Sequence, residues 1–249
     1  MPQSNFGAGY MFAIPTAANP TPVLFGAVQD IAVDFQFDLK MLYGASQFPL
    51  EQARGKAKID LKATIGRLDP SLFNQVFFNL GTGAGEYLSA NNENGSIPAT
   101  PFQITVANGA TFSTDLGVYD VTAGKFLGRV ASAPATGQYS VNTTTGVYTF
   151  AAADTGHSVR ISYTYKSSST GQTITATNSQ MGSGPIFALQ LINSFTGAGG
   201  KKSLSLYFPA VQSPKLTMPL KLDDFTLPQI EMSAQDDGSG NVFTWSLTG

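Results

Sequence analysis

The chain has 249 residues, a formal net charge of −2 and only 12% charged residues, about half the usual share of about 25%. This composition offers no basic stripe for sequence-specific nucleic-acid binding. Because the chain has no cysteine and a single histidine, disulfides, thiolate metal sites and multi-histidine metal sites are excluded.

Residues 1–26 are expected to be extended, because glycine and proline recur in this segment and break helices. Two interpretations are open: an edge strand in the subunit's own sheet, or an arm that docks on a neighbouring subunit through Tyr10, Phe12 and Ile14. The segment lacks the charged start and apolar run of a signal peptide, and no apolar run approaches the roughly 20 residues of a membrane helix. We therefore expect a protein made and assembled in the cytoplasm, without a membrane partner.

Residues 28–66 carry the clearest pattern in the chain, with apolar side chains at odd positions and polar ones at even positions. The pattern covers residues 31–40 and returns in residues 56–65. A period of two over this length predicts two long strands, each with one buried and one solvated face, joined as a hairpin. The solvated face mixes acidic and basic side chains and includes Asp34, Gln36, Asp38, Lys58, Asp60 and Lys62.

The connection between these strands, at about residues 43–55, is too long for a tight turn. It is also too rich in large apolar groups for plain disorder. We interpret it as a contact loop; the alternative is a loop folded back on its own sheet. The candidate contact residues are Tyr43, Phe48, Pro49, Leu50, Glu51 and Arg54.

A helix is predicted to begin at Pro70, because Asp69 can cap it and proline suits the first helical position. Apolar residues from Leu72 to Leu80 recur at helical spacing, and Gly81 is expected to end the helix. The helix would pack on the sheet as part of the core. Residues 81–97 are rich in Gly and Asn and are interpreted as a linker or mobile loop.

Residues 98–171 are predicted to form a small β module, with short strands near residues 102–106, 117–120, 140–142, 147–150 and 159–165. The Ser-rich residues 166–171 are typical of a flexible tether. After residue 172 the earlier alternation returns, so the module is inserted into a larger β domain. The predicted organisation is an N-terminal arm and first half of that domain (1–97), a small β-sandwich-like insert (98–171) and the second half of the domain (172–249).

Several segments together resemble one protein family. They are GAVQD before the first long strand, LYGASQFPLEQARGKAKIDLKA in the hairpin, DPSLFNQVFFN in the helix, and DDFTLPQIEMSA with DGSGNVFTWSL near the end. In this order they resemble the major tail tube protein of long-tailed, siphophage-type bacteriophages, over most of residues 24–249. The insert, with GQYSVNTTTGVYTFAAADTGHSVRISYTY, resembles a β module that recurs in phage structural proteins.

The resemblance implies a mainly β protein: a tail-tube-type β-sandwich with one flanking α-helix, a long hairpin and an inserted small β domain. Its subunits would form hexameric rings stacked into a hollow tube in the virion, assembled in the host cytoplasm. The hairpin strands would help to line the lumen, with the solvated face above as the candidate, and the hairpin loop would touch the next ring. Implied partners are other copies of the chain, the tape measure protein, tail terminator or tip proteins, and viral DNA that passes through without sequence-specific binding.

A second function class is a phage or bacterial surface module that binds carbohydrate without enzymatic activity. Such a module would use exposed aromatic side chains, and Tyr119, Tyr139 and Tyr148 are compatible with that role. The same tyrosines fit better as core residues of the small β module, because each belongs to a predicted strand or lies beside one.

A third class is an enzyme, such as a glycosidase with paired carboxylates. Residues 223–224 and 236–237 are Asp pairs, but both lie in turn-like contexts, where turn geometry already favours Asp. Residues 236–241 lack the spacing of an EF-hand calcium loop, and the context of His157 gives no support for a catalytic triad. We therefore expect no catalytic site, no cofactor and no metal.

Overall fold

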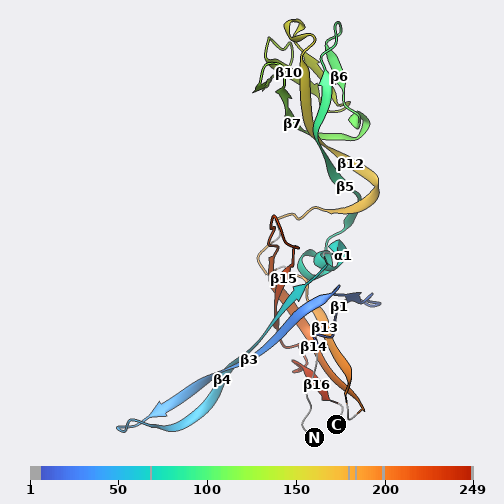
Figure 1. Cartoon of the computed structure of the whole chain (residues 1–249). Helices are drawn as coiled ribbons and strands as arrows, with labels where there is room; N and C mark the ends of the chain where they lie inside the picture. The colour runs from blue at the N-terminus through green and yellow to red at the C-terminus, as the bar shows by residue number, and fades with distance from the viewer. Residues whose placement is uncertain (1–6, 68, 179, 183, 198–199, 248–249) are drawn as a thin grey trace. The chain divides into compact units, whose positions relative to one another are not determined.

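The structure, a computed structural model, describes residues 7–67, 69–178, 180–182, 184–197 and 200–247. The chain is mainly β, as predicted, with mostly antiparallel sheets and one short helical segment of more than a single turn (Figure 1). Its contacts divide it into two compact units, Met1–Leu80 with Ala176–Gly249, and Gly81–Thr175. The second unit therefore interrupts the chain of the first.

The first unit contains one eight-stranded antiparallel sheet. Its strand order is β2-β1-β13-β14-β15-β4-β3, and β16 pairs with β14 outside this path. The strands are β1 (Tyr10–Pro15), β2 (Val23–Leu24), β3 (Val28–Tyr43), β4 (Pro49–Ile65), β13 (Phe187–Gly197), β14 (Gly200–Thr217), β15 (Gln229–Ala234) and β16 (Thr244–Leu247).

The core of this unit joins strands from both ends of the sheet order. Met11 of β1, Leu61 of β4 and Phe208 of β14 are fully buried in one hydrophobic cluster. If the sheet were flat and only the short helical segment covered one of its faces, much of this cluster would be exposed to water. The sheet therefore folds over on itself, and the alternating apolar positions of its strands meet inside.

The helical segment after β4 begins where the sequence predicts. Asp69 is the N-cap, and its side chain accepts the backbone N–H of Ser71 at 2.9 Å. The helix α1 (Pro70–Phe73) starts with proline, whose missing N–H costs nothing at this position. Leu72 and Val76 are buried in the core of the first unit, so the segment packs on the sheet as expected.

The helical segment ends earlier than predicted. After α1 the chain forms a π-helical turn, η1 (Asn74–Phe78), and Asn79 then takes the left-handed conformation that Gly81 was expected to supply. The Asn74 side chain accounts for this end, because it bonds both the N–H and the carbonyl oxygen of Leu80. Asparagine tolerates positive φ better than other non-glycine residues, which allows the chain to turn at Asn79.

The second unit consists of two four-stranded sheets with the orders β6-β11-β10-β9 and β5-β12-β7-β8. Every strand predicted in residues 98–165 overlaps an observed one. The bounds are β5 (Thr82–Ser96), β6 (Gln103–Thr105), β7 (Phe112–Asp120), β8 (Lys125–Phe126), β9 (Gly128–Arg129), β10 (Gln138–Asn142), β11 (Val147–Phe150) and β12 (Ser158–Ile174), with short 3₁₀ turns η2 (Gly109–Thr111) and η3 (Ala152–Asp154).

Two segments that were expected to be loops are strands. Residues 81–97, interpreted as a linker or mobile loop, contain β5, and the expected tether at residues 166–171 lies within β12. The two strands pair from Ser158↔Ser96 to Ile174↔Thr82, with bulges on the way. Gly, Asn and Ser have low strand propensity, but propensity in sheets is a weak preference that pairing with a neighbouring strand overrides.

The core of the second unit is aromatic and draws on both of its sheets. Tyr148 and Tyr163 are fully buried and Tyr139 is nearly so. The Tyr139 and Tyr148 hydroxyls donate to the Asp115 carboxylate at 2.7 and 2.9 Å. Burial, followed by this hydrogen bond, raises the pKa of both phenols well above the ordinary value. The interpretation of Tyr139 and Tyr148 as core residues is confirmed. For Tyr119 it is wrong, because Tyr119 is only half-buried and lies outside the core cluster of the unit.

Candidate assembly surface

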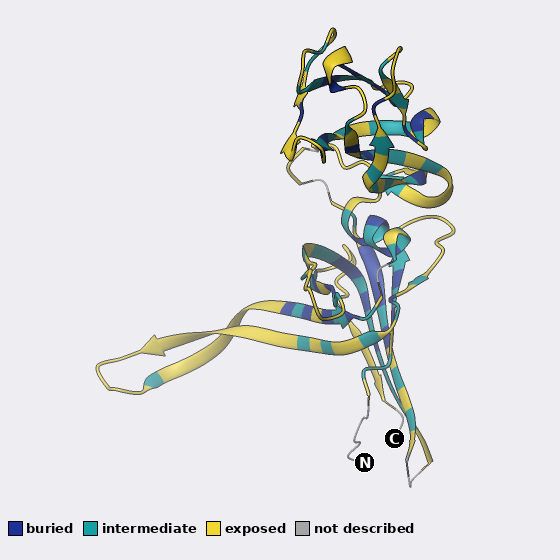
Figure 2. Ribbon diagram, turned by 45° about the horizontal axis from the view of Figure 1, so that its top comes forward, coloured by how far each residue is buried: buried dark blue, intermediate teal, exposed yellow. Residues whose placement is uncertain are grey.

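The β3–β4 hairpin is buried along only part of its length. Next to the core, β4 alternates as predicted from Ile59 to Ile65. Further out, every residue from Asp34 to Tyr43 and from Leu50 to Lys58 is exposed on whichever face it lies (Figure 2). The prediction that each strand of the hairpin buries one face along its whole length is therefore wrong for this distal part. Figure 1 shows the reason: the ribbon extends away from the rest of its own unit.

The distal ribbon continues the apolar face of the core into solvent. Ile31 and Val33 of β3 pack against the core, and the odd positions that follow point to the same side of the strand. On that side Phe37 is 47% and Leu39 56% exposed, and the guanidinium of Arg54 lies 4.5 Å from the Phe37 ring. We call this exposed stripe the ribbon face; its large apolar members are Phe35, Phe37, Leu39 and Met41.

The turn of the hairpin is much shorter than predicted. β3 ends at Tyr43 and β4 begins at Pro49, so the connection is residues 44–48. Leu50, Glu51 and Arg54 therefore lie on a strand, which bulges twice and so absorbs the extra residues that made the segment resemble a loop. The predicted contact residues still gather at the far end of the ribbon, where Phe48 is 81% and Leu50 67% exposed. Their contact with another copy stays a prediction.

The polar face of the ribbon lies opposite the ribbon face. In the β3–β4 ladder Asp34 pairs with Asp60 and Gln36 with Lys58, which places these side chains together. Lys58 Nζ lies 2.8 Å from Oδ2 of the half-buried Asp60, and this ion pair relieves the repulsion between the two facing carboxylates. This face holds the six candidate lumen residues, Asp34, Gln36, Asp38, Lys58, Asp60 and Lys62, and mixes acidic with basic side chains.

The N-terminal segment is a strand of its own sheet, which favours the first of the two interpretations. β1 pairs with β13 and with β2, and Met11 and Ala13 point into the core. Tyr10, Phe12 and Ile14 alternate with these residues; Tyr10 is exposed and the other two are half-buried. A contact of this outer side with another copy stays a prediction.

Sequence reasoning misses a second exposed apolar patch, in the coil between β14 and β15. Leu222 is 97% and Phe225 85% exposed, and Met218 and Leu220 lie beside them in the chain. We call this segment the 218–225 patch. The signal in the sequence is apolar residues at alternate positions from Leu216 to Leu222, a pattern that a half-buried strand would also produce.

β3 also presents an open sheet edge. It ends the strand order, and its outer edge pairs with no other strand of the described chain. A groove of about 460 Å³ lies beside it, lined partly by Ile31 and Val33 of β3 and by Leu191, Leu204 and Leu206 of β13 and β14. A long open edge beside apolar side chains is a template for pairing with another chain.

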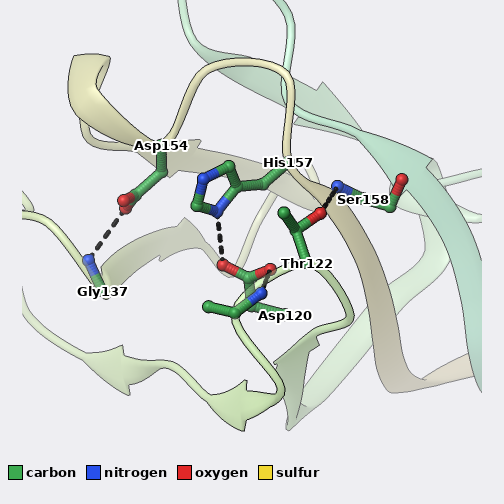
Figure 3. A network of polar contacts seen from close by, with 7 residues as sticks. Asp120, Thr122, Gly137, Asp154, His157 and Ser158 are labelled. Carbon is green, nitrogen blue, oxygen red and sulfur yellow. Dashed lines mark hydrogen bonds and ion pairs between the residues drawn. The ribbon is translucent and has the colours of Figure 1, made fainter.

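The single histidine belongs to a polar network in the second unit (Figure 3). His157 Nδ1 lies 2.7 Å from Oδ2 of the buried Asp120, whose Oδ1 accepts the Ala123 N–H at 2.9 Å. Burial raises the pKa of Asp120, but the hydrogen bonds and the His157 charge outweigh burial and hold it below the ordinary 3.8. The pair joins the end of β7 to the residue before β12, and within the described chain no hydroxyl bonds to the His157 ring as the nucleophile of a triad would.

The Asp236–Asp237 pair near the C-terminus is occupied by local hydrogen bonds. Oδ1 of Asp236 accepts the N–H groups of Gly238 and Gly240, and Oδ1 of Asp237 accepts those of Ser239 and Asn241. Turn geometry thus accounts for these carboxylates. In the part of the chain that the structure describes, no three His, Cys, Asp or Glu side chains come together as metal ligands.

Comparison with protein-family models and with curated protein sequences found no match. Across the described residues, no helix has the length and apolar character to cross a membrane.

Proposed function

We propose that this chain is a structural bacteriophage tail tube protein, which assembles with copies of itself into stacked hexameric rings that enclose a conduit for DNA. The observation that carries the proposal is the distal β3–β4 ribbon, whose apolar face continues the core and is left in solvent. The resemblance of the hairpin, helix and C-terminal segments to tail tube proteins supports the same conclusion.

The distal ribbon is difficult to account for in a monomer. Two-stranded ribbons are marginally stable in water by themselves, and soluble monomers rarely expose large contiguous apolar patches. Complete burial of one large apolar side chain contributes about 1.5–3 kcal/mol. The ribbon face has four such side chains, partly exposed, so a covering copy would contribute several kcal/mol of stabilisation. Association with a second copy supplies that cover.

The open edge of β3 favours a ring over a simple pair. Placing the ribbons of successive copies side by side would extend the ladder around a closed barrel, and closure is the arrangement that leaves no edge unpaired. Head-to-tail contacts of this kind generate rings when the rotation closes. The tip, with Phe48 and Leu50, would then project toward a neighbouring ring.

The polar face of the ribbon suits the wall of a DNA conduit. In a closed barrel it would face inward, opposite to the apolar ribbon face. Its six candidate lumen residues comprise three aspartates, two lysines and a glutamine, and one lysine is already paired with Asp60. Phosphate binding depends on Lys and Arg that neutralise the backbone, so this wall would let DNA slide past. The tape measure protein and the tail terminator or tip proteins are the further partners of the proposal.

Electron microscopy of the negatively stained protein tests the assembly directly. The register supplies a clean variant: residues 37–57 are replaced by Asn-Gly, which joins the facing pair Gln36 and Lys58 through a two-residue turn. The wild-type chain should form rings or tubes, and the variant should stay a folded single subunit with an unchanged melting temperature. Tubes from the shortened variant, or a wild-type chain that stays monomeric at high concentration, would refute the proposal.

A further inference from the structure

One face of the β5–β12–β7–β8 sheet in the second unit points away from the core. Along β12 the residues Val159, Ile161 and Tyr163 are buried, so Arg160 and Lys166 project to the opposite side. Facing residues in neighbouring strands share this side. The resulting outer face comprises Tyr87, Asn94, Tyr119, Phe126, Arg160 and Lys166.

The outer face carries aromatic side chains at two places. Arg160 lies between Asn94 on β5 and Tyr119 on β7, and Tyr119 faces Phe126 on β8. Phe126 is 75% exposed, and its ring packs edge-on to Tyr119 with centroids 5.1 Å apart. At the other end of the face, Lys166 stands opposite the exposed Tyr87. Neither aromatic group belongs to the core of the unit.

The outer face is cationic although the whole chain has a net charge of −2. Arg160 and Lys166 are both exposed, and neither forms an ion pair within the described chain. Three of the five carboxylates of the unit, Asp115, Asp120 and Asp154, are held inside, and Glu93 accepts the Tyr163 hydroxyl at 2.6 Å on the core side. The fifth, Glu86, follows the opposite alternation to Tyr87 on β5 and accepts the Thr170 hydroxyl at 2.8 Å. Small polar side chains fill the space between the two cations.

We propose that this outer face binds an acidic polysaccharide. Tyr87, Tyr119 and Phe126 offer flat apolar surfaces for the C–H-rich faces of sugar rings, and tyrosine keeps a polar tip in water. Asn94 donates to and accepts from ring hydroxyls, while Arg160 and Lys166 pair with carboxylates, Arg160 in a bidentate manner. The binding site is thus a flat strip rather than a pocket, as suits a long polymer.

The spacing of the cations distinguishes this ligand from nucleic acid. Arg160 and Lys166 are six positions apart on one strand, about 20 Å at roughly 3.3 Å per residue. A DNA strand carries a phosphate about every 3.4 Å along its axis, and tight binding needs many Lys and Arg contacts. Two separated cations are too few for tight binding of a polyphosphate, whereas a polyuronate can pair one carboxylate with each of them while its sugar rings rest on the aromatic groups beside them.

The inference is independent of the proposed tube function, because it concerns the second unit alone. Biolayer interferometry of the full chain on immobilised alginate, a polyuronate, tests it against neutral dextran and oligo(dT) surfaces. We expect binding to alginate that weakens with salt, little binding to dextran and weaker binding to oligo(dT). Assembled rings would gain avidity on all three surfaces alike, so assembly does not change this ranking.

Two variants probe the outer face on alginate. Arg160→Gln with Lys166→Gln should weaken binding roughly fivefold, the loss expected for two exposed ion pairs. Phe126→Ala should weaken it by a similar factor. The matched control, Lys201→Gln with Lys202→Gln on β14 of the first unit, makes the same change in net charge and should stay within about twofold of wild type. Equal binding to dextran and alginate, tighter binding to oligo(dT), no binding to alginate, or equal losses in the control would each overturn the proposal.

Discussion

Leu39→Ser on the ribbon face separates the stability of the subunit from the stability of the assembly. Leu39 is 56% exposed and faces Arg54 across the ribbon, outside the core cluster. The substitution should therefore change the free energy of unfolding of the single subunit by no more than about 0.5 kcal/mol, as for other surface positions. If a neighbouring copy covers Leu39, the loss should appear in assembly instead.

The size of that loss follows from the exposure. Complete burial of a leucine side chain contributes about 1.5–3 kcal/mol. A covering copy would bury the remaining 56%, which corresponds to about 0.8–1.7 kcal/mol for each added subunit. Since about 1.4 kcal/mol is a factor of ten in an equilibrium constant, the critical concentration for ring or tube formation should rise roughly four- to sixteenfold.

Analytical ultracentrifugation over a concentration series measures the critical concentration, and urea unfolding of the dilute protein measures the stability of the subunit. The matched control is Leu116→Ser in the second unit, because Leu116 is 52% exposed and lies outside the ribbon. This control should assemble like the wild type. Equal effects of the two substitutions on assembly, or a critical concentration unchanged by Leu39→Ser, would refute the assignment of the ribbon face as an interface.

Three further outcomes are expected. Leu61→Ala, at a fully buried core position, should lower the free energy of unfolding by about 2–5 kcal/mol in urea titrations, and a loss below about 1 kcal/mol would contradict the packing described. The folded pKa of Asp120 lies below 3.8, so the stability that its carboxylate contributes is present above pH 3.8 and is lost as the pH falls through the folded pKa. In thermal unfolding measured at a series of pH values, Asp120→Asn should lower stability at neutral pH by about 1–3 kcal/mol and should flatten the decline below pH 3.8. A pH profile identical to that of the wild type would refute the stabilising role given to the Asp120–His157 bond. Thr82 and Ile174 face each other across the β5–β12 ladder, so replacing residues 82–174 by Gly-Gly should leave the first unit folded and able to assemble in electron micrographs. If the shortened chain lost its cooperative unfolding transition, the second unit would be required for the first unit to fold.

The local sequence pattern is sufficient to predict the structural features that depend only on residues close together in the chain. The two-residue alternation of β3 and β4 identified the hairpin and the sides of its strands, and Asp69 with Pro70 identified the start of the helix. These are properties of backbone geometry and of side chains a few residues apart, so they can be inferred without knowing the fold. The paired Gly-rich and Ser-rich ends of the insertion were visible too, although as loops.

Pairing between distant segments made strands of the Gly-rich and Ser-rich ends of the insertion. β5 and β12 lie far apart in the sequence, and their hydrogen-bonded ladder makes strands of residues that favour turns. Pairing also extended β4 as far as Pro49, because bulges let a strand absorb extra residues that sequence reasoning assigned to a loop.

For the candidate site, the sequence by itself determined which residues share the polar face of the ribbon and which apolar residues stand at its tip. Only the tertiary structure decided that the apolar stripe is exposed from Phe37 to Met41 while the same stripe is partly buried against the core at Ile31 and Val33. The alternation is identical in both parts, and whether it is covered depends on where β13 and β14 fold back over it. The burial of each residue in this stripe depends on residues more than a hundred positions away in the chain, and a local sequence pattern cannot predict their position.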